Sequence, residues 1–258
     1  MSAIASENST SQYVLVLGAS GGIGMAFVRQ FLADANTIRV YATYRSRAGA
    51  GSLFDLAAAH GDRLRLLPLD LTVESEIEAT LATVRQDCGR LHNVVNCVGF
   101  LHDKHQQPEK SLRHINAENL ARYFQINSIS AILLAKHLQP LLRHDERSVF
   151  ANLSAKIGSI GDNALGGWYG YRASKAALNM LMRNVAIEYR RVCPNAIVVM
   201  LHPGTTDTRL SEPFQRNVPP EKLFTPERTV TQLLSIVNKL TPVESGSFFS
   251  WDGQRLPW

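Results

Sequence analysis

Short runs of apolar residues alternate along this chain with longer stretches in which apolar residues recur every three or four positions. Residues 13–17, Tyr-Val-Leu-Val-Leu, form a compact apolar run that ends at a glycine, which is typical of a buried strand. Phe27, Val28 and Phe31 instead have the spacing of one helix face. The same patterns predict strands over 13–17, 37–44, 64–69, 91–97, 148–153, 197–201 and 248–251. Helices are predicted over 25–33, 74–87, 117–143 and 169–189, and a last one begins after Thr225.

Strands separated by helical stretches of this length indicate βαβ units and a parallel sheet. Because crossovers between parallel strands are right-handed, such a sheet carries helices on both faces. We therefore predict a single α/β domain over residues 12–258, a doubly wound parallel sheet of about seven strands. Residues 1–11 are polar and rich in serine, which favours a disordered tail over a signal peptide.

Composition excludes several classes of protein. With 45% hydrophobic and 19% charged residues the chain is typical of soluble globular proteins, and no apolar run approaches the roughly 20 residues that span a membrane. The three cysteines are widely spaced, and His102 and His105 have no third ligand spaced to join them. We expect a cytoplasmic protein with reduced thiols and no metal. The net charge of +5 is scattered along the chain, which argues against a nucleic-acid partner.

A glycine-rich turn follows the first predicted strand and opens the first helix. Residues 18–24 read Gly-Ala-Ser-Gly-Gly-Ile-Gly. Glycine lets the backbone turn tightly, and a helix start offers free N–H groups and partial positive charge to a pyrophosphate. Glycines also make ordinary turns, but the position between strand and helix favours a Rossmann-type dinucleotide site. The predicted contacts are Gly18, Ser20, Gly22, Ile23 and Gly24.

The end of the second strand distinguishes the two nicotinamide cofactors. An acid there suits the free ribose 2′-hydroxyl of NAD, whereas an arginine suits the 2′-phosphate of NADP. This strand is followed by Arg45, and no Asp or Glu lies nearby. A guanidinium can hold a phosphate through two parallel hydrogen bonds, although an arginine at a strand end can also simply extend into solvent. We predict NADP(H) as the cofactor.

Tyr171 and Lys175 are four positions apart in the predicted helix 169–189. This spacing puts both side chains on one helix face. A cation beside a phenol favours the ionised form, which draws the tyrosine pKa from about 10 toward neutrality. Tyr171 is therefore a candidate general acid for a carbonyl oxygen, or a base in the reverse direction. Tyr-xxx-Lys pairs also arise by chance, and the place of this one, after the fifth strand, favours catalysis.

These motifs, in this order, resemble the short-chain dehydrogenase/reductase family. Residues 18–24 have its GxxxGxG spacing, and the string YRASKAALN that begins at Tyr171 is similar to its catalytic helix. The resemblance covers the chain after residue 12, and segments 108–112 and 158–160 look like carbonyl reductases related to the bacterial C-factor signalling protein. It implies an oxidoreductase that transfers hydride between NADP(H) and a carbonyl or alcohol substrate, in the direction of carbonyl reduction.

The resemblance also implies contacts to the cofactor beyond the glycine turn. Lys175 would hold the nicotinamide ribose. Leu17 stands where the family has a threonine, so a side-chain hydrogen bond that steadies the turn is expected to be missing. Taken singly, Asp70 could cap a helix and Asn96 could form a turn. The implied contacts are Asp70, Leu71, Asn96, Val98, Gly99, Tyr171, Lys175, Pro203, Gly204, Thr206 and Thr208.

Two further catalytic residues are implied in the same way. Asn127 falls where the family has an asparagine that bends a helix and orders a water beside the lysine. Family strands end Asn-x-Ser-Ser, with the second serine bonding the substrate carbonyl, whereas residues 152–155 read Asn-Leu-Ser-Ala. We predict that Ser154 takes this role, with Ser159 as a rival. A serine at a strand end can also bond its own backbone.

The remaining expectations concern the substrate and the alternatives. Residues 209–224 contain Pro213 and Phe214 and are expected to form a partly ordered, apolar lid. Family members commonly associate, which implies a homodimer or homotetramer. Two other functions stay open: a sensor that binds NADP(H) without turnover, and an NAD-dependent alcohol dehydrogenase. Replacing Tyr171 tests the first, and replacing Arg45 tests the second.

Overall fold

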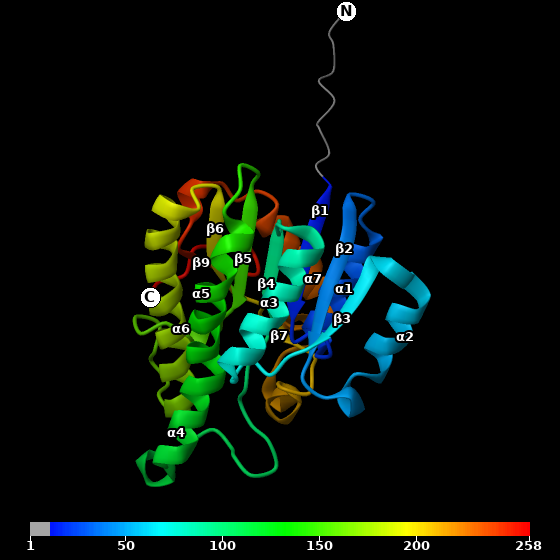
Figure 1. Ribbon diagram of the computed structural model, residues 1–258. Helices are drawn as coiled ribbons and strands as arrows, with labels where there is room; N and C mark the ends of the chain where they lie inside the picture. The colour runs from blue at the N-terminus through cyan, green and yellow to red at the C-terminus, as the bar shows by residue number, and fades with distance from the viewer. Residues whose placement is uncertain (1–10) are drawn as a thin grey trace, which may run out of the picture.

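Parallel strands form the central sheet of the computed structural model, which describes residues 11–258 (Figure 1). They are β1 (Gln12–Leu17), β2 (Thr37–Tyr44), β3 (Leu64–Pro68), β4 (Asn93–Asn96), β5 (Ser148–Leu153), β6 (Ala196–His202) and β9 (Ser247–Ser250). The seven strands lie in the order β3-β2-β1-β4-β5-β6-β9, and every neighbouring pair is parallel. The predicted doubly wound α/β sheet is therefore confirmed. The predicted tail lies outside the described residues, apart from Ser11.

Helices cover both faces of the sheet, as the right-handed crossovers require (Figure 1). One face carries α1 (Gly22–Ala33), α2 (Gly51–His60) and α7 (Pro226–Val237), and the other carries α3 (Glu74–Cys88), α5 (Ser130–Leu142) and α6 (Tyr169–Val192). The alternation of β1 shows the division: Val14 and Val16 pack into the first layer, and Leu15 and Leu17 into the second. No helix within residues 11–258 is long and apolar enough to cross a membrane.

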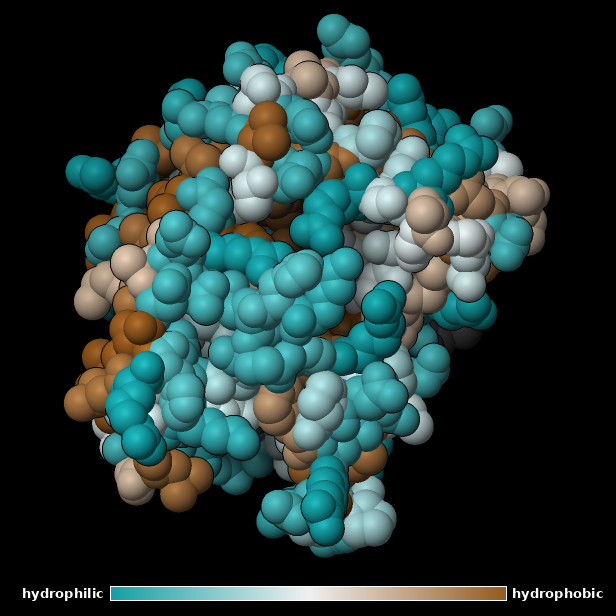
Figure 2. All heavy atoms as spheres, turned by 90° about the horizontal axis from the view of Figure 1, so that it is seen from below, coloured by the Kyte–Doolittle hydropathy of each residue, from teal (hydrophilic) through white to brown (hydrophobic). Residues whose placement is uncertain are grey.

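The direction in which the strands are added reverses between β3 and β4, which lie on opposite sides of β1. Loops that leave neighbouring strands at such a point diverge and open a crevice at the carboxyl ends of the strands, where ligands bind in sheets of this kind. This end carries α4 (Ala117–Phe124) and β7 (Thr205–Thr206) and is at the bottom of Figure 1. Seen from below, polar residues cover most of the surface, with apolar atoms showing between them and at one edge (Figure 2).

Three elements differ from the sequence prediction. The helix predicted over 117–143 is broken into α4 and α5 by a π-helical turn, Gln125–Ile129. Helix α2 was not predicted because Leu53 is its one buried residue, so it lacks a clear apolar stripe. A short pairing of β7 with β8 (Leu223–Phe224) ties the segment after β6 to the end of the predicted lid.

Candidate active site

The turn after β1 is so tight that two of its positions require glycine. Gly18 has a φ of +70°, a left-handed conformation that side chains disfavour. A Cβ added at Gly24 would lie 2.3 Å from the carbonyl oxygen of Gly18, so α1 packs directly on the turn. The first turn of α1 contains no acidic residue, and its N-cap is Gly21, which has no side chain that could cap the helix. Its first N–H groups are therefore available to an anion such as a pyrophosphate.

Thr43 of β2 supplies the side-chain hydrogen bond that steadies this turn. Its hydroxyl accepts from the N–H of Gly18 at 3.2 Å, and its carbonyl oxygen accepts from Ala19 at 2.9 Å. Leu17, in contrast, is fully buried in the core. The expectation that Leu17 leaves the turn without such a bond is therefore wrong, because the neighbouring strand provides the hydroxyl that the preceding residue lacks.

Segments that follow β1, β4 and β6 meet around the turn. A Cβ added at Gly18 would lie 3.1 Å from Cγ2 of Val98, and one added at Gly22 would lie 2.9 Å from Cγ2 of Thr208. Asn96 shapes the segment after β4, since its side-chain oxygen accepts from the N–H of Val98 at 3.1 Å. Predicted cofactor residues from three strand ends thus lie side by side.

The segment after β6 is braced by its neighbours. Gly204 has a φ of +73°, and a Cβ added there would lie 2.6 Å from the ring of Phe224, so the segment requires glycine next to Pro203. The hydroxyl of Thr206 lies 2.8 Å from that of Thr229 in α7, and both residues are buried. The predicted cofactor contacts of this segment therefore lie on a backbone that Phe224 and Thr229 hold in place from two sides.

Asp70 and Leu71 form the loop after β3. The carboxylate of Asp70 accepts from the N–H of Thr72 at 2.9 Å and from its hydroxyl at 2.7 Å. Leu71 is buried, and its neighbour Thr72 accepts a hydrogen bond from the side chain of Gln125 through its carbonyl oxygen. This geometry gives Asp70 a turn-forming role, and its contact with an adenine stays a prediction.

Arg45 is exposed just beyond the end of β2. Within residues 11–258 no hydrogen bond or ion pair engages its guanidinium group, so the group is free to take an anion. Arg47, two positions on, instead stacks over Phe54 with its guanidinium carbon 4.4 Å from the ring centroid. Of these two cations, Arg45 is the one that is not stacked on a ring.

Tyr171 and Lys175 lie buried in the first two turns of α6, with exposed fractions of 7% and 3%. The ammonium of Lys175 donates to the carbonyl oxygen of Leu153 at 3.0 Å and lies 5.8 Å from the centroid of the Tyr171 ring. The end of β5 thereby fixes the lysine beside the phenol. The helical spacing predicted from the sequence does bring the two side chains together.

Burial, rather than the neighbouring cation, dominates the titration of this pair. It raises the pKa of the Tyr171 phenol above its usual value, with a smaller contribution from Tyr123, and it lowers the pKa of the Lys175 ammonium to about 8. The sequence prediction that Lys175 draws the Tyr171 pKa toward neutrality is therefore not what this structure shows. The reason is that the buried phenol loses the water that would stabilise its ionised form.

Asn127 lies at the centre of the π-helical turn and is buried. Its side-chain oxygen accepts from the N–H of Phe100 at 2.7 Å, and its amide donates to the carbonyl oxygen of Phe100 at 2.9 Å and to the hydroxyl of Ser174 at 3.0 Å. A Cβ added at Gly99 would lie 3.8 Å from the Asn127 oxygen and 3.5 Å from the Lys175 ammonium. Asn127 therefore connects the loop after β4 to α6, next to the ammonium of Lys175.

The serines near the end of β5 already have partners. Ser154 is buried and donates its hydroxyl to the side-chain oxygen of Asn179 at 2.7 Å. The hydroxyl of Ser159 accepts from the N–H of Asp162 at 3.2 Å. Ala155 packs against the cluster that contains Tyr171. To bond a substrate carbonyl, Ser154 must therefore leave Asn179.

Two aromatic side chains that the sequence analysis did not single out, Tyr123 and Trp168, flank Tyr171. The ring centroids of Tyr123 and Trp168 each lie 6.2 Å from that of Tyr171. Phe214, from the predicted lid, packs on Trp168 with a centroid distance of 4.7 Å. His102 packs on Phe214, and its ring also bonds the carbonyl oxygen of Leu210 at 3.1 Å. These contacts join segment 209–224 to the proton-donor candidate through a wall of rings.

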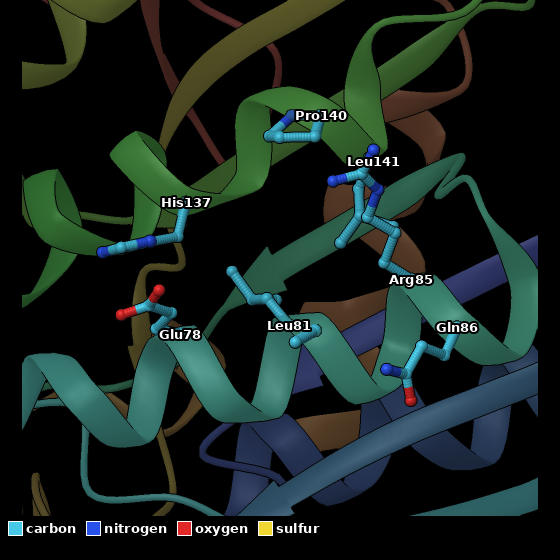
Figure 3. A pocket seen from close by; sticks show the side chains of 8 residues that line it. Glu78, Leu81, Arg85, Gln86, His137, Pro140 and Leu141 are labelled. Carbon is cyan, nitrogen blue, oxygen red and sulfur yellow. The ribbon is translucent and has the colours of Figure 1, made fainter.

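A separate groove of about 540 Å³ lies between α3 and α5 (Figure 3). Glu78 and His137 face each other across it, and Arg85 and Leu141 lie farther along. None of the residues that line this groove is a predicted site residue. Because it lies away from the carboxyl ends of the strands, it is distinct from the candidate site.

Comparison with known proteins agrees with this arrangement. A family model described as short chain dehydrogenase matches residues 12–219. The 1-hydroxy-2-glutathionyl-2-methyl-3-butene dehydrogenase of a Rhodococcus strain is 30% identical over 95% of this chain and 99% of its own length. The C-signal protein of Myxococcus xanthus is 32% identical over 57% of this chain and 84% of its own. Among solved structures, an NADPH-bound carbonyl reductase from chicken fatty liver has a TM-score of 0.86 and 29% identity, covering 96% of this chain and all of that one.

Proposed function

Since the chain belongs to the short-chain dehydrogenase family, we propose that it is an NADP(H)-dependent carbonyl reductase with Tyr171 as its proton donor. The observation that carries the proposal is the buried pair of Tyr171 and Lys175, backed by Asn127 and joined to the glycine turn through Val98 and Gly99. These groups have the chemistry that a hydride-transfer site requires: a proton donor, a fixed cation and a cradle for phosphate.

The choice of NADP(H) rests on Arg45, which is free at the end of β2, where NAD enzymes of this kind carry an acid. The chicken carbonyl reductase, which is described as NADPH-bound, is consistent with it. The glycine turn would hold the pyrophosphate at the start of α1. The other proposed contacts are Asp70, Leu71, Asn96, Val98, Gly99, Lys175, Pro203, Gly204, Thr206 and Thr208.

The protein's own part in the reaction is to bind the carbonyl, exclude water and move one proton. When bound, NADP(H) supplies the hydride. Tyr171 donates its phenolic proton to the carbonyl oxygen as negative charge develops there. Burial raises the phenol's pKa and so keeps it protonated at neutral pH. Lys175, with a pKa lowered to about 8, is still mostly charged at that pH and stabilises the phenolate that proton transfer leaves behind.

The substrate proposed for this site carries an apolar ring or a similarly bulky apolar group. Trp168 and Phe214 form the wall beside Tyr171, and Ala155 replaces the hydroxyl that family members commonly have there. Such a wall favours flat apolar groups over charged ones. A role for Ser154 toward the carbonyl, a lid over 209–224, a homodimer or homotetramer and a cytoplasmic location remain predictions.

The proposal is tested by NADPH oxidation with a panel of aldehydes, ketones and quinones. The variant is Tyr171→Phe, and Tyr169→Phe is the control because Tyr169 is an exposed tyrosine two positions earlier on the same helix. We expect Tyr171→Phe to lose roughly 100-fold or more in kcat, the scale of a lost general acid, with NADPH affinity kept. Tyr169→Phe should retain wild-type turnover.

Each other outcome points elsewhere. Turnover that survives in Tyr171→Phe contradicts the assigned proton donor. A wild type that binds NADPH and turns over no carbonyl supports the sensor hypothesis instead.

A further inference from the structure

Glu109 is a buried acid that lies 61 positions before Gly170 in the sequence but is hydrogen-bonded to the first turn of α6, the helix that carries Tyr171 and Lys175. It is 2% exposed and lies in the loop between β4 and α4. One carboxylate oxygen accepts from the N–H of Gly170 at 3.1 Å, and the backbone carbonyl oxygen of Glu109 accepts from the N–H of Trp168 at 2.6 Å. The other carboxylate oxygen has no partner within the described residues. A buried carboxylate needs strong compensation, and the start of a helix provides it.

Helix α6 has no cap of its own. Its N-cap residue is Trp168, which makes no side-chain cap hydrogen bond, and its first turn contains no acid. The start of a helix is usually capped by a side chain that is its neighbour in sequence. Glu109 instead supplies the capping carboxylate from 61 positions away. The N–H groups at the start of α6 and the carboxylate of Glu109 stabilise each other.

The residues before α6 are held in a conformation that they would not choose by themselves. Gly166, Gly167 and Trp168 all have left-handed φ values, of 64°, 65° and 51°, and Trp168 is the one such non-glycine residue in the described part of the chain. A bulky side chain avoids this region, and surrounding contacts have to impose it. The hydrogen bond from Trp168 to Glu109 and the packing of its ring on Tyr171 and Phe214 are those contacts.

Close packing transmits the position of Glu109 to Tyr171. A Cβ added at Gly170 would lie 2.4 Å from the ring of Tyr123 and 3.0 Å from Glu109, so these three residues leave no free space between them. Tyr123 is fully buried, bonds the carbonyl oxygen of Leu101 at 2.6 Å and packs its ring on Tyr171. The proton-donor candidate follows Gly170 directly, so a shift at the start of α6 moves its phenol.

We propose that Glu109 is a positioning residue, which holds Tyr171 and Trp168 in place through its hydrogen bonds to the first residues of α6. It does not touch the substrate or the cofactor. The inference rests on the proposed function, in which Tyr171 donates the proton and Trp168 lines the substrate site. It assigns Glu109 a role in proton transfer and none in NADPH binding.

Three substitutions separate the parts of this role. Glu109→Gln keeps an acceptor for the N–H of Gly170, Glu109→Asp keeps the charge but shortens the reach by one methylene, and Glu109→Leu removes the acceptor. Glu118→Leu is the control, because Glu118 is an exposed acid in the first turn of the neighbouring α4. Steady-state kinetics with a ring-bearing ketone are combined with NADPH titration by fluorescence, which also reports whether each variant folds.

We expect the Asp and Leu variants to lose about 10- to 100-fold in kcat, the cost of misplacing a reacting group by about an ångström, with NADPH affinity unchanged. Glu109→Gln should recover kcat to within about threefold of the wild type, because its acceptor restores the position of Tyr171. Wild-type kcat in both the Asp and Leu variants overturns the proposal. So does a Gln variant as slow as Leu. If Glu109→Leu fails to bind NADPH, the kcat values of Glu109→Asp and Glu109→Gln decide whether the proposal holds.

Amide hydrogen exchange over residues 168–171 tests the same contacts without activity. The structure predicts faster exchange in Glu109→Leu and Glu109→Asp, because the N–H of Gly170 loses its side-chain acceptor or its fit, whereas the N–H of Trp168 keeps a backbone acceptor. If the wild type turns over no carbonyl, the proposed function fails, and exchange still decides the inference. Unchanged exchange in the Leu and Asp variants then overturns it.

Discussion

The two halves of the candidate site are built from different parts of the chain and in different ways. The cofactor half is closed by backbone: Gly18 and Gly24 form the turn, and Thr43 bonds it from the next strand. The substrate half is closed by side chains, with Trp168 and Phe214 packed edge to face between segments far apart in sequence. A backbone-built half accepts one residue type at its critical positions. A side-chain-built half can be resized one ring at a time, so changes there should alter the choice of substrate before they alter the chemistry.

Gly24→Ala should produce the largest effect in this comparison. The added Cβ would lie 2.3 Å from the carbonyl oxygen of Gly18, a backbone atom that cannot move aside cheaply. We expect the free energy of unfolding to fall by about 3 kcal/mol and NADPH binding to be lost, as overpacking of a tight site predicts. Denaturant unfolding and fluorescence titration measure both. Gly49→Ala, where an added Cβ meets nothing within 4 Å, is the control. Equal behaviour of the two variants would contradict a cofactor half closed by backbone.

Arg45→Ala should have an intermediate effect, confined to the cofactor. Loss of charge-assisted hydrogen bonds to a phosphate is expected to raise the KM for NADPH about 10- to 100-fold and to leave the KM for NADH unchanged. The measurement is steady-state kinetics with both cofactors. Arg47→Ala is the matched control, because its guanidinium is stacked on Phe54. If Arg47→Ala reverses the preference and Arg45→Ala does not, the phosphate lies on the other arginine.

Phe214→Ala should have the smallest effect, and one that depends on the substrate. Removing an edge-to-face partner of Trp168 is expected to raise the KM for a ring-bearing ketone about two- to tenfold, with no change for a small aliphatic aldehyde or for NADPH. Arg216→Ala, an exposed position in the same segment, serves as the control. An equal loss of activity with all carbonyls would mean that Phe214 supports the reaction itself and does not discriminate between substrates.

Residues in the cofactor half could be found from the sequence because their signals are local. The glycine turn is recognisable from seven consecutive residues, and Tyr171 and Lys175 are recognisable from their spacing of one helical turn. Short apolar runs and helical spacing were likewise enough to predict the doubly wound sheet, since central strands such as β5 and β6 are buried on both faces and read as apolar runs.

The rest depends on contacts between distant segments, which no local pattern encodes. Nothing near Leu17 indicates that Thr43 steadies the turn, and nothing near Trp168 indicates that Glu109 caps its helix. The pair Gly166-Gly167 before an aromatic residue was the available hint of a left-handed approach to α6. The pKa of Tyr171 was misjudged for a related reason: burial is a property of the folded protein, and helical spacing reports only the nearest cation.

The hydrogen bond between Glu109 and Gly170 also has a consequence for the order in which the protein folds. It closes a loop of 61 positions that contains α4, α5 and β5. Closing such a long loop costs conformational entropy, so this contact forms after the intervening elements have paired. The glycine turn itself, in contrast, is closed by Thr43, which lies 25 positions from Gly18. A newly made chain is therefore expected to form the glycine turn early, and to become able to transfer a proton only when the longer-range contacts close.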